Sequence, residues 1–411
     1  MARILVIGGS LGGLFVANML HQDGHDVEVL EKVNGSMNGR GAGIVSHDVL
    51  VNSLERAGLD VQATLGVEVP GRVLLDQSGK SLIAFNMPQV LTSWSRLYQI
   101  LKSAFPADRY HQGVTVTRIE ERDNSVHALA TTDGKENTWQ ADVLIASDGI
   151  RSNVRQQLFP QVQPQYAGYV GWRGVCDESL LSSLTRTTLF DYFGFCVPPE
   201  EQIIGYPVAG SDNDTTRGHR AYNFVWYRPA AQGEELQALL TDADGVHYPL
   251  GIPPHKVDSR QLAKVREEAR RVLSPQFAEI LEKTPQPFLQ PIFDVASDTV
   301  NVGRVALMGD ASFVARPHIG MGVAKASQDA VALADAIRTH GANATALAAY
   351  AKVRLPAGQS AVHRARWLGS YIKSPDGQPQ PMNQRQHQAI HETAIDLGRY
   401  GHQSVFKENS T

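Results

Sequence analysis

The sequence predicts an α/β protein in which a Rossmann-like domain is discontinuous and a second domain is built on a mainly antiparallel sheet. Three observations predict this class. The chain opens with a strand, a Gly-rich turn, a helix and a second strand within residues 3–31. Residues 165–288 have a different sequence pattern, with several strand-sized runs rich in aromatic and β-branched residues. After residue 288 the strand-and-helix pattern of the N-terminal part returns, with a strand at 305–308 and a helix from about 322 to 337.

Length and composition indicate an ordinary folded protein with room for a buried site. At 411 residues the chain is longer than a single hydrophobic core usually grows, which favours two domains. A net charge of -4 gives no indication of a nucleic-acid partner. The apolar runs are strand-sized, far below the roughly 20 residues that cross a bilayer, so no membrane partner is expected. The N-terminus lacks a signal-peptide pattern and Cys176 and Cys196 lack metal-ligand spacing, so we expect a cytoplasmic protein without a bound metal.

The expected elements divide the chain into three parts. Residues 1–164 and 289–373 form the nucleotide-binding domain, 165–288 form the second domain, and 374–411 form a tail that is helical around 384–398. In the first part a strand at 142–146 follows a strand-rich stretch that begins near residue 111. In the second part strands are expected at 166–175, 188–197, 202–208 and 220–228, as in an antiparallel sheet.

The Gly-rich turn carries the strongest local signal in the chain. The sequence Gly8-Gly9-Ser10-Leu11-Gly12-Gly13 lies between a strand and a helix, and Glu31 follows 18 residues after Gly13. In dinucleotide-binding turns the glycines let a pyrophosphate approach the helix N-terminus, and an acidic residue about 20 positions on binds the ribose. Ser10 stands where the usual second glycine falls, and a Gly-rich turn without a ligand is the alternative. The residues expected to contact a dinucleotide here are Gly8, Ser10, Leu11, Gly13, Glu31 and Lys32.

Two further segments extend this pattern to a family. Residues 146–155 contain Asp148-Gly149 directly after a strand, and residues 309–312 contain Asp310 after another strand, followed by 316–322 and a helix. In order and separation the three segments resemble the fingerprints of the flavoprotein aromatic hydroxylases, the para-hydroxybenzoate hydroxylase family, across essentially the whole chain. Residues 8–10, 41–45, 166–170, 172–175, 223–224, 226–227, 316–318 and 324–327 resemble in particular the branch of that family that hydroxylates pyridines.

The resemblance implies a GR2-type FAD-binding domain and assigns residues to parts of the cofactor. Asp310 would hold the ribityl or ribose side, and Arg96 would lie near the pyrophosphate, unless it is simply a surface arginine. Asp148 and Gly149 match a motif implicated in both FAD and nicotinamide contacts. The residues that would surround the flavin ring are Arg40, Gly43, Ile44, Pro317, Gly320, Met321 and Gly322. Arg151 and Arg155 either serve anionic groups or are solvated charges at the start of a helix.

The resemblance also implies the reaction. A reduced nicotinamide would reduce FAD, dioxygen would add to give a flavin C4a-hydroperoxide, and an electron-rich aromatic ring would take the oxygen. A hydroxylated pyridine or related N-heteroaromatic is the favoured substrate, and a phenol stays open. The candidates for the base that activates the ring are His318 and Tyr206, with Pro317 beside the reacting face. The choice between NADH and NADPH stays open, although the resemblance favours NADH. The resemblance also implies that the protein could form a homodimer.

Other interpretations of the same scaffold stay open. A flavin oxidase or dehydrogenase would insert no oxygen, and a redox-sensing or interaction protein would not turn over. A halogenase is disfavoured, because the Trp-x-Trp-x-Ile-Pro signature of that group is absent. Two positions depart from the broader family and are expected near the flavin: Phe313 replaces a histidine and Lys325 replaces an amide.

Two other groups of residues have competing interpretations. His387 and His391 have metal-ligand spacing on a helix face but no third ligand, so a structural role is favoured. Trp172, Trp226 and Tyr227 either line a flat aromatic pocket or belong to the core.

Overall fold

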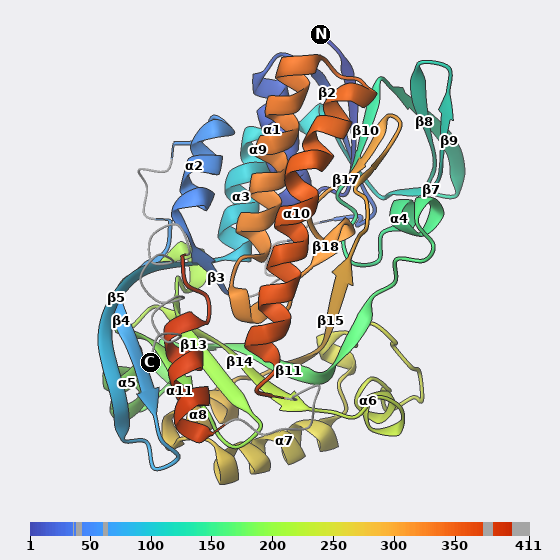
Figure 1. Ribbon diagram of the computed structural model, residues 1–411. Helices are drawn as coiled ribbons and strands as arrows, with labels where there is room; N and C mark the ends of the chain where they lie inside the picture. The colour runs from blue at the N-terminus through green and yellow to red at the C-terminus, as the bar shows by residue number, and fades with distance from the viewer. Residues whose placement is uncertain (36, 38–42, 61–64, 373–380, 397–411) are drawn as a thin grey trace, which may run out of the picture.

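The computed structural model describes residues 1–35, 37, 43–60, 65–372 and 381–396. Figure 1 shows two regions: one holds a parallel sheet and most of the long helices, and the other is built around a large sheet flanked by shorter helices. Strands from distant parts of the sequence meet in each region, which confirms the expected mixed α/β class.

The parallel sheet joins three separated segments of the chain. All of its neighbouring strands are parallel except the pair at one edge, β16–β17. Its order is β16 (Asn301–Val302), β17 (Val305–Leu307), β10 (Val143–Ala146), β1 (Arg3–Ile7), β2 (Asp26–Glu31) and β6 (Tyr110–Gln112). Because β1, β2, β10 and β17 run in one direction, the segments that follow them leave from the same edge, where open α/β sheets bind ligands.

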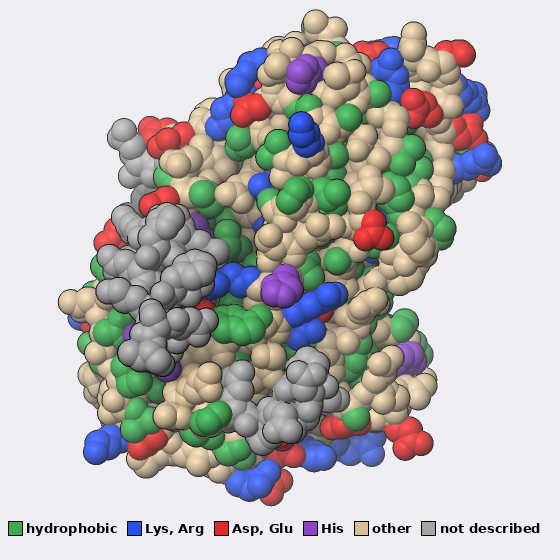
Figure 2. All heavy atoms as spheres, viewed as in Figure 1, with side chains coloured by type: hydrophobic (Ala, Val, Ile, Leu, Met, Phe, Trp, Pro, Cys, Tyr) green, Lys and Arg blue, Asp and Glu red, His purple; other side chains and the backbone are tan. Residues whose placement is uncertain are grey.

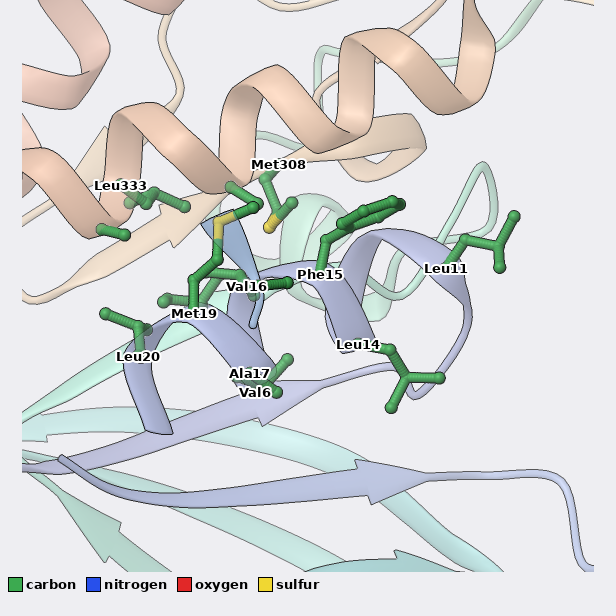
Figure 3. Close-up of a cluster of buried hydrophobic side chains, with 14 of the residues drawn as sticks. Val6, Leu11, Leu14, Phe15, Val16, Ala17, Met19, Leu20, Met308 and Leu333 are labelled. Atoms are coloured by element: carbon green, nitrogen blue, oxygen red, sulfur yellow. The ribbon is translucent and has the colours of Figure 1, made fainter. Parts of the chain in front are cut away.

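Helices cover one face of this sheet and a small sheet covers the other. The helices are α1 (Leu11–Gln22), α3 (Trp94–Ala104), α9 (Gly322–His340) and α10 (Ala344–Gly369). Since α1 lies between the sheet and α9, nearly all of its residues are buried, and Figure 3 shows Phe15 and Met19 pointing toward the helix that carries Leu333. The opposite face is covered by β7 (Val114–Arg122), β8 (Ser125–Thr132), β9 (Lys135–Ala141) and the short α4 (Asn153–Leu158).

Within the described residues the second sheet has nine strands and is antiparallel apart from one pair, β12–β4. Its order is β18 (Phe313–Val314), β15 (Phe288–Ala296), β11 (Gln165–Asp177), β14 (Ala221–Pro229), β13 (Gln202–Val208), β12 (Tyr192–Cys196), β4 (Val67–Leu75), β5 (Ser81–Ser93) and β3 (Gly43–Ser46). The expected strand at 188–197 is therefore too long at its start. Ser182 caps α5 (Ser183–Leu189) by accepting a hydrogen bond from the Thr185 backbone, so the chain is still helical at Leu189.

Alternation along these strands separates a core face from a cavity face. Trp172, Phe224 and Trp226 point to one side, where they pack on α7 (Ser259–Val272) and α8 (Pro275–Lys283), next to α6 (Glu234–Leu239). Arg173 and Tyr227 are on the other side, facing the parallel-sheet region. The aromatic-pocket interpretation therefore applies to Tyr227, whereas the two tryptophans belong to the core.

The C-terminal helix is held by a buried arginine. Arg72 on β4 donates to the backbone oxygens of Ile390, Thr393 and Ala394 at the end of α11 (Met382–Glu392). α11 covers the core of the expected helix at 384–398, but residues 397–398 lie outside the described residues. Asp48, the first residue of α2 (Asp48–Arg56), also meets this segment, because its N–H donates to Asp396.

The sheets do not divide where the expected domains do. β3, β4 and β5 lie within 1–164, yet they extend the same sheet as strands from 165–288. The boundaries at 164 and 288 therefore stay a proposal about folding units. No described helix is long and apolar enough to cross a membrane. Figure 2 shows hydrophobic side chains scattered among polar ones on the visible face.

Candidate active site

The Gly-rich turn forms one wall of a cavity at the carboxyl edge of the parallel sheet. The cavity has a volume of about 240 Å³, and its lining includes Gly8, Ser10, Glu31, Lys32 and Asp148. Gly8 has a φ of +95°, and a Cβ there would lie 2.4 Å from the Ser147 carbonyl oxygen, so only glycine fits. Ser10 has a φ of -82°, which any L-residue adopts, so the departure from the usual glycine leaves the turn intact.

Glu31 is fixed by the turn it faces. Its carboxylate accepts hydrogen bonds from the backbone N–H groups of Gly9 at 2.7 Å and Val33 at 2.8 Å. The side chain is only 5% exposed but lines the cavity, so its remaining acceptor capacity is available to a ribose hydroxyl. Leu11 and Gly13 do not line this cavity. Leu11 is buried in the core, and Gly13 packs against the Gly8 carbonyl, where a Cβ would lie at 1.9 Å.

The turn after β10 borders both this cavity and a second one. Asp148 and Gly149 line the first cavity, and Ile150 lines the second. Desolvation raises the pKa of Asp148, and its Oδ1 is buried without a hydrogen-bond partner among the described residues. Such an atom is available to a ligand hydroxyl. Arg155, in contrast, is fully buried and donates to the backbone oxygen of Ala311, so it supports the turn and does not reach a ligand.

The second cavity, of about 330 Å³, lies between the two regions of the protein. Its lining on the parallel-sheet side comprises Asp310, Pro317, Gly320, Gly322 and Val323, with Gly43 and Ile44 at the edge strand β3. Gly320 has a φ of +61° before α9, and no side chain caps the first turn of that helix. Its open N–H groups favour negative charge at the cavity wall.

Asp310 lies open toward the same cavity. Desolvation by the surrounding protein raises the pKa of its carboxyl, against the opposing charge of Lys325. Of the other residues expected near the cofactor, Met321 and the half-buried Arg96 lie outside both cavity linings. Arg40 lies outside the described residues.

His318 lies behind the cavity. The short turn Pro317–Ile319 puts Pro317 in the lining and buries the His318 ring completely. Its Nε2 lies 2.8 Å from the Tyr169 hydroxyl, and burial lowers its pKa to about 3. The hypothesis that His318 takes a proton directly from the substrate therefore does not fit its position. His318 follows Pro317 in the sequence, but the two side chains do not line the same cavity, because the turn points them in different directions.

The sheet side of the second cavity carries aromatic, apolar and cationic groups. Tyr206 and Tyr227 line it with Phe193, Ile204 and Val225, as do Arg173 and Gln290. Burial raises the pKa of the Tyr206 hydroxyl, so the phenol stays protonated near neutral pH. Sequence reasoning found Tyr206 but assigned no role to Arg173 or Gln290. The alternation along β11 is a signal that separates Arg173 from the core-facing Trp172.

The two departures from the broader family do not line the cavity. Phe313 is buried against α10, where a Cβ on Gly358 would lie 2.2 Å from its ring. Lys325 is 3% exposed and donates to the Gly309 backbone oxygen at 2.9 Å. Lys325 therefore acts on the flavin-side wall through the turn that carries Asp310 and through its charge, which opposes the rise in the pKa of Asp310. Neither side chain lines the cavity in which the ring is expected.

The two histidines of α11 pack against each other and against β5. Their rings pack 4.2 Å apart, and His391 also stacks on Phe85. Among the described residues no group of three or more His, Cys, Asp or Glu side chains could hold a metal ion.

The two neighbouring cavities together fit FAD. The first offers a close backbone approach at Gly8 and carboxylate acceptors at Glu31 and Asp148, as a pyrophosphate and ribose require. The second offers a helix N-terminus and glycines beside an apolar and aromatic wall, as a flat ring that gains electrons requires.

Comparisons with known proteins agree with this fit. Residues 166–294 match the family model described as FAD binding domain-like. The chain is 30% identical to 2,6-dihydroxypyridine 3-monooxygenase of Paenarthrobacter nicotinovorans over 336 residues, which cover 81% of this chain and 82% of that protein.

Solved structures agree over nearly the full length. The structure of 2,6-dihydroxypyridine-3-hydroxylase from Arthrobacter nicotinovorans superposes with a TM-score of 0.85 at 28% identity, covering 95% of this chain and 96% of that one. Klebsiella pneumoniae HpxO complexed with FAD and uric acid gives a TM-score of 0.75 at 25% identity, covering 97% of this chain and 94% of that one. The chain therefore belongs to the flavoprotein aromatic hydroxylases and is an FAD-dependent monooxygenase.

Proposed function

We propose that this protein hydroxylates an electron-rich N-heteroaromatic ring that carries a hydroxyl group, with NADH or NADPH and dioxygen as co-substrates. The observation that carries the proposal is the composition of the second cavity. One wall holds Pro317, Gly320 and the start of α9, and the facing wall holds Tyr206 and Tyr227. A flat aromatic substrate between these walls would lie directly beside the flavin site. The similar proteins act on or bind a dihydroxypyridine and uric acid, both N-heterocycles.

FAD would be held along the two neighbouring cavities by residues of three turns. Glu31 and the Gly8 turn would bind its adenosine and pyrophosphate side, Asp148 and Asp310 its hydroxyls, and Gly320 and Gly322 its ring edge. Bound there, FAD would supply hydride acceptance and dioxygen activation. Lys32 faces the first cavity from its rim and would meet the adenosine side. Assigning Arg40 to the ring remains a prediction.

The protein's own residues position the ring and exclude water. Phe193, Ile204 and Val225 give the cavity an apolar wall against which a ring packs. Tyr206 remains a neutral phenol, so in this proposal it donates a hydrogen bond to a ring oxygen and orients it. Pro317 closes the opposite side and removes a backbone N–H that would otherwise need a partner.

The nicotinamide would bind only transiently. The described residues contain no second β-α-β unit with its own Gly-rich turn, so a resident site for a second dinucleotide is not part of the proposal. NADH is the favoured reductant on the family resemblance. A cytoplasmic location, where reduced nicotinamides are supplied, and a homodimer remain predictions.

The first experiment combines a spectrum with a substrate panel. Purified protein should show bound flavin, and NADH oxidation should rise sharply with one hydroxylated pyridine or phenol. The same rates with NADPH decide the reductant. Bound flavin with hydrogen peroxide formation but no hydroxylated product would favour the oxidase alternative. Absence of stimulation by any aromatic would favour a protein without turnover.

A further inference from the structure

Arg173 is a cavity-lining cation without an acidic partner among the described residues. The other lining arginine, Arg316, is neutralised by Asp294, whose Oδ2 lies 2.9 Å from its Nη2. Arg173 makes one hydrogen bond to a described side chain, from Nη1 to Gln290 Oε1 at 2.6 Å. Its Nε is buried without a partner among the described residues.

The two strands that carry this pair fix its position. Arg173 is on β11 and Gln290 is on the adjacent β15, where Gln290 faces Gly171. The position opposite Gln290 carries no side chain of its own, and the space above Gly171 is taken by Val225 and Tyr227, which also line the cavity. Because an amide can only accept from the guanidinium and cannot neutralise it, Gln290 orients Arg173 without satisfying its charge.

A partly buried guanidinium whose Nε is withdrawn from water is costly without an anion. Removing a charge from water costs free energy that a neutral amide does not return, whereas a paired and hydrogen-bonded anion does. A guanidinium also presents several N–H donors in a plane that matches two oxygens or one oxygen held at two points. The geometry therefore suits an anionic oxygen that arrives with a ligand.

We propose that Arg173 binds an anionic oxygen carried by the substrate ring, either a deprotonated hydroxyl or a carboxylate. This inference rests on the proposed function and names the charge state in which the substrate is held. If the oxygen is a ring hydroxyl, its proton goes to solvent and Arg173 keeps its own proton. Holding the anion enriches the ring in electrons, which an oxygen-accepting ring requires.

The charge of Arg173 converges with the two cavity tyrosines. It opposes the desolvation that raises the pKa values of Tyr206 and Tyr227, so its field reaches both phenols. Arg173 and both tyrosines also line the same cavity. This cluster gives the substrate a defined polar end and leaves the apolar wall for the ring.

The test measures binding and needs no turnover. FAD-loaded protein is titrated calorimetrically with two matched pairs: 2,6-dihydroxypyridine against 2,6-dimethoxypyridine, and 6-hydroxynicotinate against 6-hydroxynicotinamide. Arg173→Gln should raise the Kd of at least one ionisable ligand by roughly 10- to 100-fold, as expected for loss of a charge-assisted hydrogen bond. The neutral member of that pair should change less than about threefold. Loss in the first pair identifies a deprotonated hydroxyl, and loss in the second identifies a carboxylate.

Two controls keep the test decisive. Arg186→Gln removes an exposed arginine of α5 and should leave every Kd unchanged. Arg173→Lys should restore part of the anion preference because it keeps the charge. If Arg173→Gln does not fold, the wild-type affinity for 2,6-dihydroxypyridine is followed against pH and should rise as the free ligand ionises.

Two failures are distinguishable. Equal losses for ionisable and neutral ligands in both pairs, or an affinity that falls as the ligand ionises, would overturn the anion site while the hydroxylase stands. A holoenzyme whose nicotinamide oxidation responds to no aromatic compound would overturn the proposed function instead.

Discussion

Replacing Asp329 with asparagine is expected to destabilise the protein strongly, because its carboxylate is the centre of a buried charge network. Its Oδ1 accepts a hydrogen bond from Arg354 Nε at 2.6 Å, and its Oδ2 accepts one from the Gly309 N–H at 3.0 Å. Lys325 Nζ lies 3.6 Å from the same carboxylate. The network holds the turn that carries Asp310 into the flavin-side wall of the cavity.

The magnitude follows from what remains after the substitution. An asparagine of the same shape leaves two cations without their anion and turns an N–H₂ group toward a donor. Breaking a buried ion pair by neutralising one partner costs about 3–5 kcal/mol. The Arg354 side chain is 11% exposed and regains some water, which favours the lower end, about 3 kcal/mol, or more than a 100-fold change in the unfolding equilibrium.

Urea unfolding followed by far-ultraviolet circular dichroism measures this change. The matched control is Asp335→Asn, on the same helix, whose pair with Arg338 is half exposed and should contribute less than about 1 kcal/mol. The FAD-loaded Asp329 variant should also release flavin more readily than the control. If both variants unfold at the same urea concentration, the buried network contributes no more than a surface pair and the reasoning is wrong.

Three further substitutions test other parts of the account. Glu31→Gln should weaken FAD binding roughly 10-fold in a flavin fluorescence titration, since the Gly9 N–H loses a charged acceptor; an unchanged affinity would contradict the ribose site. Burial lowers the pKa of His318 from 6.5 to about 3, so the unfolded state binds more protons between these values and stability falls as pH falls through them. His318→Gln should therefore lose less stability than the wild type over that range in pH-dependent unfolding, and an equal loss would refute the assignment. Gly8→Ala should abolish FAD binding. The control Gly24→Ala should retain it, because Gly24 also has a positive φ but no atom lies within 4 Å of an added Cβ. Flavin retention by both variants would contradict the close backbone approach expected at Gly8.

The nucleotide-binding part of the fold could be predicted because its signals are local. Strand-sized apolar runs, turn glycines and Glu31 all act within a few residues of one another, and the structure brings these segments to one sheet edge. The strands β4 and β5 could not be predicted as part of the second sheet. Five of the 13 β5 residues are exposed, and β4 joins through a parallel pair with β12, more than a hundred residues away in sequence.

The site residues could be predicted where a local motif determines which residues lie around them. Gly8, Glu31, Asp148 and Asp310 are examples, because each lies at or just after the carboxyl end of a strand of the parallel sheet. The turn at Pro317 reversed the expectation for its neighbour, since side-chain direction there depends on packing against residues far away in sequence. Arg173 escaped prediction for a related reason. Whether Arg173 has an acidic partner depends on the side chains of three neighbouring strands that are far apart in sequence. No short motif can therefore indicate it.

Oxygen incorporation tests the central claim most directly. The FAD-loaded protein would be supplied with reduced nicotinamide, the aromatic compound that most stimulates its oxidation, and ¹⁸O₂, and the product would be analysed by mass spectrometry. The account predicts one ¹⁸O atom in the ring product and no label when only the water is labelled. A product without ¹⁸O, accompanied by hydrogen peroxide equal to the nicotinamide consumed, would contradict it.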